Sequence, residues 1–125
     1  MKLLLDTHVL LWWLDDHPRL SATARAYIAD RQHQVYVSAA SVWEASIKES
    51  KGLLRLSDSF DAKLAAEPFL TLAMTYRHAR TAGTLPPIHK DPFDRMLIAQ
   101  CQLEGMTLVT NDKALAAYGA PIIEA

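Results

Sequence analysis

Cysteine is nearly absent from this chain, and its scarcity limits both the chemistry and the compartment of the protein. Cys101 is the only cysteine among 125 residues, so no internal disulfide can form. Its neighbours Ile98, Ala99 and Leu103 indicate a position in the core of a helix. Half of the residues are hydrophobic, which is enough for one domain of this length to bury its own core without a disulfide or a structural metal. We therefore expect a reducing, cytoplasmic location.

The chain also lacks an excess of charge of either sign. It has 13 lysine and arginine residues against 14 aspartate and glutamate residues, which gives a formal net charge of -1. A protein with this balance has no overall basic field to hold long duplex DNA. Any contact with a nucleic acid must therefore be made by a local group of side chains.

No stretch is apolar over the ~20 residues that a membrane-spanning helix requires. Leu3–Leu14 followed by Ala22–Ala24 loosely imitates a secretory signal and its cleavage site. Asp6 and His8 interrupt this apolar stretch, however, and the charged segment Asp15–Arg19 separates it from the imitated cleavage site. We therefore favour a folded N-terminal segment over a signal peptide, and we expect no contact with a membrane.

Short apolar runs alternate with helical patterns along the whole chain, which predicts βα units that form a parallel sheet. The expected strands are residues 2–5, 34–38, 69–72, 107–110 and 121–124. The expected helices are residues 7–14, 21–31, 39–51, 58–67, 75–82, 92–104 and 113–118, with Gly52 and Gly83 ending the third and the fifth. We find no repeat and no linker, and we expect one α/β domain over residues 1–125.

Four carboxylates lie next to the predicted junctions between strands and helices. They are Asp6 in LLLDTH, Glu44 in SVWEAS, Asp94 in KDPFDRML and Asp112 in LVTND. The carboxyl ends of parallel strands share one edge of a sheet, so the four side chains converge there if the first strand is central. Carboxylates so close to a core are costly unless something neutralises them together. A shared divalent cation is the simplest explanation.

Helix capping is the structural alternative for the aspartates. Asp side chains accept hydrogen bonds from the free N–H groups at helix starts, and for each aspartate taken singly we favour this interpretation. Asp91 is a good N-cap, and either Asp6 or Asp112 can start a helix. Asp94, in contrast, falls on the inward apolar stripe of its helix, and Glu44 lies too far into its helix for a cap. Four independent caps at one sheet edge would be a coincidence.

The ligand types indicate which cation fits. Hard oxygen ligands without cysteine or clustered histidine favour Mg²⁺ or Mn²⁺ over zinc. His8 and His89 lie near the acids, but a single histidine beside a carboxylate is more often a hydrogen-bonding or substrate-side group than a ligand. Mg²⁺ or Mn²⁺ held by carboxylates serves mainly phosphate chemistry, because it activates a bound water and neutralises charge in the transition state.

The four acidic segments resemble the motifs of the PIN domain, specifically those of the VapC-type ribonuclease toxins of toxin–antitoxin modules. The match covers nearly the whole chain, and DPFDRMLIAQ is its most specific stretch. The resemblance implies a three-layer α/β/α sandwich around a five-stranded parallel sheet. It also implies an endoribonuclease that depends on Mg²⁺ or Mn²⁺ and hydrolyses single-stranded or structured RNA.

The resemblance further implies a role for each acid and a set of partners. Asp6 and Asp94 are expected to contact the metal directly, and Glu44 and Asp112 to assist directly or through water, so that all four are catalytic. Thr7 and Thr110 match the small hydroxyl residues of the family, whereas His8, His89 and Asp91 receive no role. The implied partners are a protein antitoxin, which places a basic side chain in the acidic pocket, and a second copy of the chain in a homodimer.

Substrate contacts outside the acids are weaker predictions. A basic rim is possible near the proposed edge, although for any single residue we favour an ordinary solvated side chain. Its candidates are Lys48, Lys51, Arg77, Arg80, His89, Lys90 and Arg95. Trp12, Trp13 and Trp43 are expected in the core or an interface, with Trp43 on an apolar helical face shared with Ala40 and Ile47.

Three other function classes share some of these features. Phosphoacceptor receiver domains need an acidic pair after the first strand and an acceptor Asp after the third, but Asp6 stands alone and Ala73-Met74 follows the third strand. A haloacid-dehalogenase-type phosphatase requires a second Asp at the position of His8. A catalytically silent interaction module remains the third alternative, and the four intact acids argue against it.

Overall fold

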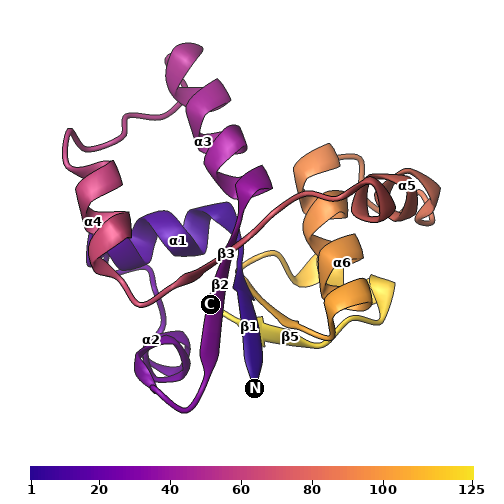
Figure 1. The fold of residues 1–125 in the computed structure, drawn as a ribbon, viewed down its shortest axis with the longest axis horizontal. Helices are drawn as coiled ribbons and strands as arrows, with labels where there is room; N and C mark the ends of the chain where they lie inside the picture. The colour runs from indigo at the N-terminus through magenta and orange to yellow at the C-terminus, as the bar shows by residue number, and fades with distance from the viewer.

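The computed structural model describes residues 1–125 and contains one five-stranded, all-parallel sheet (Figure 1). Its strands are β1 (Lys2–Leu5), β2 (Gln34–Ser38), β3 (Leu70–Leu72), β4 (Thr107–Thr110) and β5 (Ile122–Glu124). They lie in the order β3-β2-β1-β4-β5, so β1 is central, as the convergence of the acids requires. This order excludes the receiver-domain alternative, because the sheet of that fold has the order 2-1-3-4-5.

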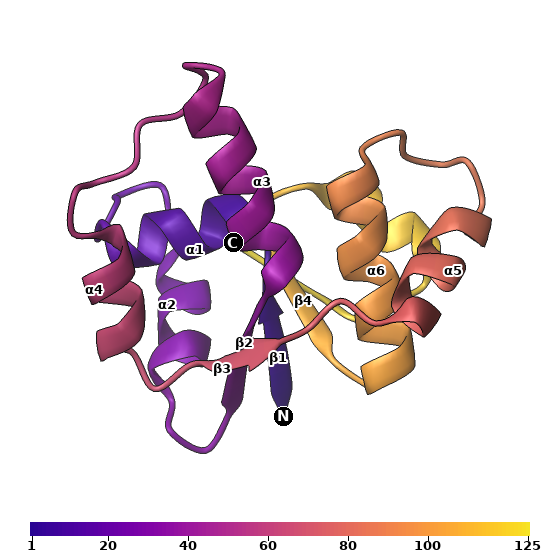
Figure 2. The same cartoon turned by 45° about the horizontal axis from the view of Figure 1, so that its top comes forward.

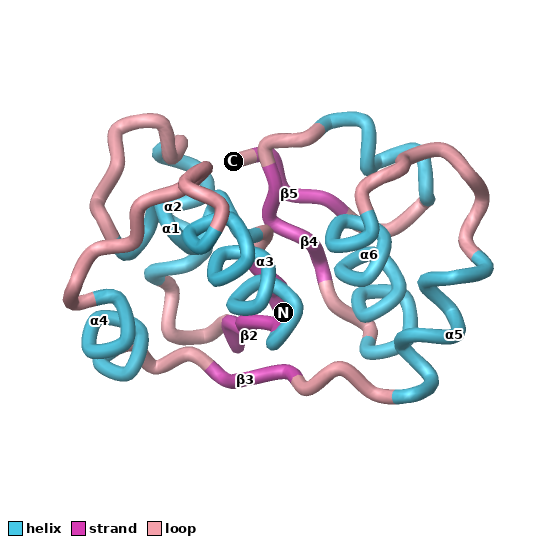
Figure 3. The backbone as a smooth tube through the Cα atoms, turned by 90° about the horizontal axis from the view of Figure 1, so that it is seen from above, coloured by secondary structure: helices cyan, strands magenta, loops and turns pink.

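Helices cover both faces of the sheet (Figure 3). They are α1 (Thr7–Leu14), α2 (Ala22–Ala29), α3 (Ala39–Ser50), α4 (Phe60–Ala66), α5 (Tyr76–Thr84), α6 (Pro92–Glu104) and the 3₁₀ helix η1 (Lys113–Tyr118). α1, α2 and α4 lie on one side, and α5 and α6 lie on the other. The predicted three-layer α/β/α sandwich is confirmed.

The central strand explains the two layers. Leu3, Leu4 and Leu5 are all fully buried, which is typical of a parallel strand covered on both faces. Because successive side chains point to opposite faces, Leu3 and Leu5 join a core with α1 and α2, whereas Leu4 joins a second core with α6 and η1. α3 stands beyond the carboxyl ends of β1 and β2 (Figure 2). It therefore closes the edge at which the acids were predicted.

Two predictions about helix ends had different outcomes. Gly52 follows the end of α3 with a φ of 71°, a left-handed conformation that glycine adopts without strain. Gly83, in contrast, does not end α5, which continues to Thr84. Helical φ and ψ are disfavoured for the residue before a proline, so the helix ends at Thr84 and Leu85, which precedes Pro86, is its extended C-cap.

The predicted apolar face of α3 is wrong at Trp43, although Ala40 is buried and Ile47 half-buried as expected. The residues that α3 buries are Ala40, Ser41, Glu44 and Ala45, whereas the Trp43 side chain is 55% exposed. The buried face of α3 is small and partly polar because it lies against the acidic edge of the sheet. Trp12 and Trp13 do pack against the first core, as expected.

None of the helices is both long and apolar enough to span a membrane.

Candidate active site

A cleft of about 450 Å³ lies at the carboxyl edge of the sheet, and none of its nine lining residues is hydrophobic. They are Asp6, His8, Glu44, Lys48, His89, Asp91, Asp94, Asn111 and Asp112. The four predicted acids thus meet in one cleft, although they come from the end of β1, from α3, from α6 and from the turn after β4. Parallel strand order and the position of α3 produce this convergence.

Asp6 both caps a helix and lines the cleft. Its Oδ1 accepts a hydrogen bond from the Thr7 N–H at 2.6 Å, and its Oδ2 accepts one from the Thr110 hydroxyl at 2.6 Å. The residue is only 4% exposed. Burial raises the pKa of the Asp6 carboxyl, although the hydrogen bonds from Thr110 and Thr7 act in the opposite direction. Capping and a place in the cleft are therefore compatible.

Glu44 has no capping role, because it lies in the second turn of α3. Its Oε1 accepts a hydrogen bond from the Thr7 hydroxyl, and its Oε2 accepts one from the Lys48 ammonium, both at 2.6 Å. Thr7 therefore connects the backbone next to Asp6 with the Glu44 side chain. The two small hydroxyl residues, Thr7 and Thr110, hold one cleft carboxylate each.

Asp94 is the least compensated acid of the cleft. Asp91 is the N-cap of α6 and accepts hydrogen bonds from the N–H groups of Phe93 and Asp94, so the Asp94 side chain has no capping role. That side chain is 14% exposed. Burial, followed by the nearby carboxylates of Asp6 and Asp91, raises the pKa of Asp94 to about 7. The predicted inward direction of Asp94 is confirmed.

Asp112 is held from two sides. Its Oδ1 accepts a hydrogen bond from the Ala114 N–H at 3.0 Å, which caps η1, and its Oδ2 lies 3.0 Å from Nε2 of His89. The same His89 nitrogen lies 3.6 Å from Oδ2 of Asp94. One side-chain nitrogen or oxygen from each of His89, Asp94 and Asp112 lies within 4.8 Å of the other two.

The cleft is strongly acidic. It contains five carboxylic acids and one lysine, and Lys48 is engaged with Glu44, whose hydrogen bond is the main cause of the raised pKa of the Lys48 ammonium. Burial is the largest cause of the raised pKa values of Asp6 and Asp94, so the charged forms of these two acids are costly and a bound cation would favour them. Mostly carboxylate oxygens are available as ligands, and this donor set fits a hard divalent cation.

Most residues of the predicted basic rim do not reach the cleft. Lys48 and His89 line it. Arg95 instead donates hydrogen bonds to the carbonyl oxygens of Ala82 and Leu85, both at 2.9 Å, and of Pro86 at 3.0 Å. The other four candidates, Lys51, Arg77, Arg80 and Lys90, are exposed and lie outside the cleft lining. Arg95 is therefore neither a rim residue nor the solvated side chain that was favoured, but a half-buried donor to backbone carbonyl oxygens.

Two features of the cleft were missed by sequence reasoning. Asn111 lines it, and its position directly after β4 is the signal that could have shown this. The second feature is the ion pair between Glu44 and Lys48, which are four residues apart on one helix with the acid first, a spacing that favours pairing.

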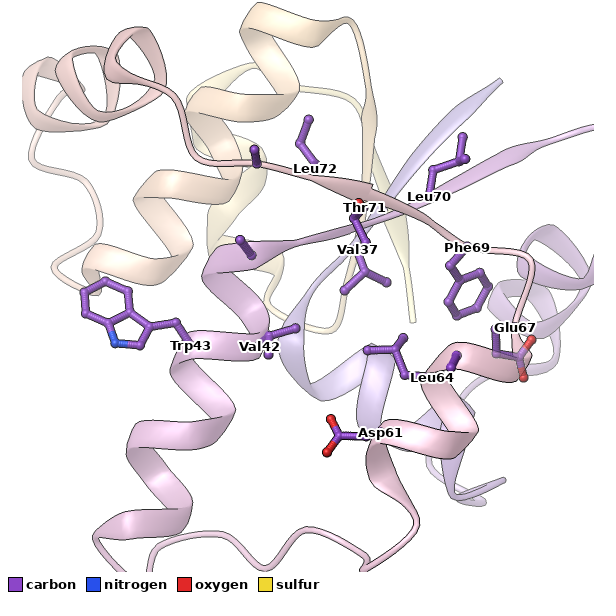
Figure 4. A pocket seen from close by; sticks show the side chains of 13 residues that line it. Val37, Val42, Trp43, Asp61, Leu64, Glu67, Phe69, Leu70, Thr71 and Leu72 are labelled. Atoms are coloured by element: carbon purple, nitrogen blue, oxygen red, sulfur yellow. The ribbon is translucent and has the colours of Figure 1, made fainter.

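An apolar groove of about 680 Å³ lies beside the edge strand β3, between α3 and α4 (Figure 4). Ten of its 13 lining residues are hydrophobic. Val37, Val42 and Leu64 point toward one another at its centre, and two acidic side chains, Asp61 and Glu67, lie along its α4 side. Unlike the acidic cleft, this groove has the character of a surface that binds apolar side chains.

Comparisons with known proteins give consistent results. The family model described as "PIN domain" matches residues 3–121. Ribonuclease VapC22 of Mycobacterium tuberculosis is 32% identical to the chain over 121 residues, which cover 94% of this chain and 92% of that protein.

Solved structures share the fold at lower sequence identity. The crystal structure of VapBC2 from Rickettsia felis bound to a promoter DNA fragment contains a chain with a TM-score of 0.76 and 16% identity, over 99% of this chain and 98% of that one. A chain in the DNA-bound VapBC of Salmonella typhimurium gives a TM-score of 0.71 and 17% identity, with the same two coverages. At these identities the likeness shows the fold.

Proposed function

This chain belongs to the PIN domain family, and from that premise we propose that it is a metal-dependent endoribonuclease, the toxin of a toxin–antitoxin pair that acts in the cytoplasm. One observation carries the proposal: four acids from four separate elements line one cleft that has no hydrophobic residue. We propose that residues 1–125 act as one domain and that the substrate is single-stranded or structured RNA. The relative at 32% identity, which is named as a ribonuclease, supports this reaction class.

We assign the metal to Asp6 and Asp94, and a supporting catalytic role to Glu44 and Asp112. Bound Mg²⁺ or Mn²⁺ would activate a water and neutralise charge on the phosphate. Thr110 and Thr7 hold Asp6 and Glu44 through 2.6 Å hydrogen bonds, so these carboxylates are oriented in advance. A cation would also favour the charged form of Asp94, whose pKa is raised to about 7.

Cleavage assays with and without metal test the reaction. Purified protein is expected to cut single-stranded RNA with Mg²⁺ or Mn²⁺, and excess EDTA is expected to stop it. Asp94→Asn should abolish cleavage and leave the fold intact, since an isostere fits the same space. A purely structural role for Asp94 predicts the reverse, namely full activity with a change in stability alone. Undiminished cleavage in EDTA would overturn the proposed mechanism.

We further propose that a protein antitoxin inhibits the enzyme from two surfaces. The apolar groove beside β3 would take apolar side chains of the antitoxin, and a basic side chain would enter the acidic cleft (Figure 4). A guanidinium can pair with a carboxylate through two hydrogen bonds, so arginine suits Asp6 or Asp94. The proposed active form is a homodimer, and sedimentation of the purified chain tests this assembly.

Calorimetric titration tests the antitoxin proposal. Asp6→Ala and Asp94→Ala are expected to lose RNA cleavage and to bind the antitoxin more weakly, but still measurably, because the groove contacts remain. Unchanged affinity in both variants would show that the cleft is not a docking point.

A further inference from the structure

We propose that His89 is a positioning residue, which holds Asp112 through its Nε2–H group and does not bind the metal itself. The inference rests on the proposed function, because it assigns a role within the same metal site. The distances alone suggest otherwise, because the side chains of His89, Asp94 and Asp112 lie close enough together to bind one ion. The hydrogen bonds around the imidazole decide between the two roles.

The backbone at His89 is fixed by two neighbouring elements. The residue lies in the loop between α5 and α6, and its N–H donates a hydrogen bond to the Tyr118 hydroxyl of η1 at 2.9 Å. That hydroxyl in turn donates to the carbonyl oxygen of Pro86 at 3.1 Å. Arg95 of α6 donates to the Pro86 and Leu85 carbonyl oxygens of the same loop and to the Ala82 carbonyl oxygen in the last turn of α5. These hydrogen bonds therefore fix the backbone that carries the His89 imidazole.

The hydrogen-bond network assigns the tautomer of the ring. The Asp91 N–H donates to Nδ1 of His89 at 3.1 Å. A backbone N–H can only donate, so Nδ1 must carry a lone pair, and in the neutral ring the proton is on Nε2. Nε2 lies 3.0 Å from Oδ2 of Asp112, and it therefore donates to that carboxylate.

Both ring nitrogens are consequently occupied. A metal-binding nitrogen needs a free lone pair, but Nε2 carries the proton and the lone pair of Nδ1 accepts from Asp91. The Asp112 carboxylate, in contrast, is held by His89 on one oxygen and by the Ala114 N–H on the other. Such partners orient a carboxylate that contacts the ion directly or through a water, and they typically contribute about 10–100-fold in metal affinity.

Two substitutions separate the two hydrogen bonds of the ring. His89→Gln keeps an amide donor near the position of Nε2, whereas His89→Asn keeps an amide acceptor near the position of Nδ1 and loses the donor to Asp112. Mn²⁺ affinity, measured by calorimetry on the full chain, is expected to fall about tenfold or more in His89→Asn and less than about threefold in His89→Gln. If His89 only shaped the loop by accepting from the Asp91 N–H, His89→Gln would lose more Mn²⁺ affinity than His89→Asn. That result would overturn the proposal.

Pulsed electron paramagnetic resonance of the Mn²⁺-loaded protein tests the second half of the proposal. We expect identical ¹⁴N couplings in the wild type and in His89→Gln, because His89 contributes no coordinated nitrogen. A directly coordinated nitrogen in the wild type that disappears in His89→Gln would refute the assignment. Neither readout uses RNA cleavage, so an inactive wild type that still binds Mn²⁺ would contradict the proposed ribonuclease function and leave the test of His89 intact.

Discussion

At the scale of residues, capping and site formation proved to be one arrangement rather than two alternatives. Asp6 caps α1 and Asp112 caps η1, and both also line the cleft. Asp91 caps α6, so the Asp94 side chain accepts no capping hydrogen bond from that helix. The meeting of the acids was predictable because the carboxyl ends of parallel strands lie at one edge of the sheet, so polar residues next to these ends lie close together. The tautomer of His89 was not predictable, because it depends on a loop conformation that no local pattern specifies.

The pKa of Asp94 predicts how the metal-free protein responds to pH. In the folded state this pKa is raised to about 7 from an ordinary value of 3.8. Between these values the folded chain holds a proton that the unfolded chain releases, so stability falls as pH rises through this window. Asp94→Asn removes the titration. Without metal we expect the stability advantage of the variant over the wild type to grow by roughly 2 kcal/mol between pH 5 and pH 8, after allowance for solvent screening.

Urea unfolding in EDTA at the two pH values measures this difference. Adding Mn²⁺ at pH 8 should stabilise the wild type more than the variant, since a ligand stabilises the state that binds it. A wild type that gains stability relative to Asp94→Asn between pH 5 and pH 8 in EDTA would contradict the buried, uncompensated position of Asp94.

At the scale of elements, the ends of helices show where sequence patterns fail. All five strands were predicted within one residue at each end, because each is a short apolar run between polar turns. Gly83 was misassigned because glycine is typical after a helix but is also tolerated inside one, and the proline three residues later decides the end. The exposed Trp43 was misassigned because periodicity alone does not say which side of α3 faces the acidic edge.

Gly83→Ala is expected to stabilise the protein by about 0.5–1 kcal/mol. Gly83 lies within α5, has no positive φ and has open space where a Cβ would go. Gly105→Ala is the matched contrast, because Gly105 ends α6 with a φ of 66° and an alanine there is strained. Thermal unfolding of both variants tests the helix boundary, and a loss of stability in Gly83→Ala would contradict it.

Arg95→Met is expected to cost about 2 kcal/mol, because several buried or half-buried carbonyl oxygens lose their donor. The variant should also lose RNA cleavage beyond the loss of stability, since the same loop carries His89. Arg80→Met on the exposed side of α5 is the control and should stay within about 0.5 kcal/mol of the wild type. Equal urea midpoints for the two variants would show that Arg95 does not hold the loop.

At the scale of the whole molecule, the sheet order places an acidic cleft and an apolar groove on either side of α3. The cleft was predictable from four acids, because each is a single residue beside a recognisable strand or helix. The groove was not, because its lining comes from four elements, β2, α3, α4 and β3, whose packing distance depends on tertiary structure. The family resemblance supplied the partner, and the groove supplies a surface on which that partner can bury apolar side chains.

Thr71→Glu tests this surface. Thr71 lies on the edge strand β3 in register with Val37, lines the groove and is exposed, so the substitution should be tolerated by the fold. We expect antitoxin affinity to fall about tenfold or more, because a charge enters an apolar contact. Leu53→Glu is the matched control, since Leu53 is 73% exposed and lies outside the groove. Equal affinities in the two variants, with cleavage measured to confirm folding, would place the antitoxin elsewhere.

The chemistry of the RNA ends tests the central claim most directly, namely that the acidic cleft directs a water to the phosphate. Single-stranded RNA cut by the purified protein in Mg²⁺ or Mn²⁺ is analysed by mass spectrometry. The account predicts 5′-phosphate and 3′-hydroxyl ends, because water rather than the ribose 2′-hydroxyl attacks. Products with 2′,3′-cyclic phosphate ends would contradict it.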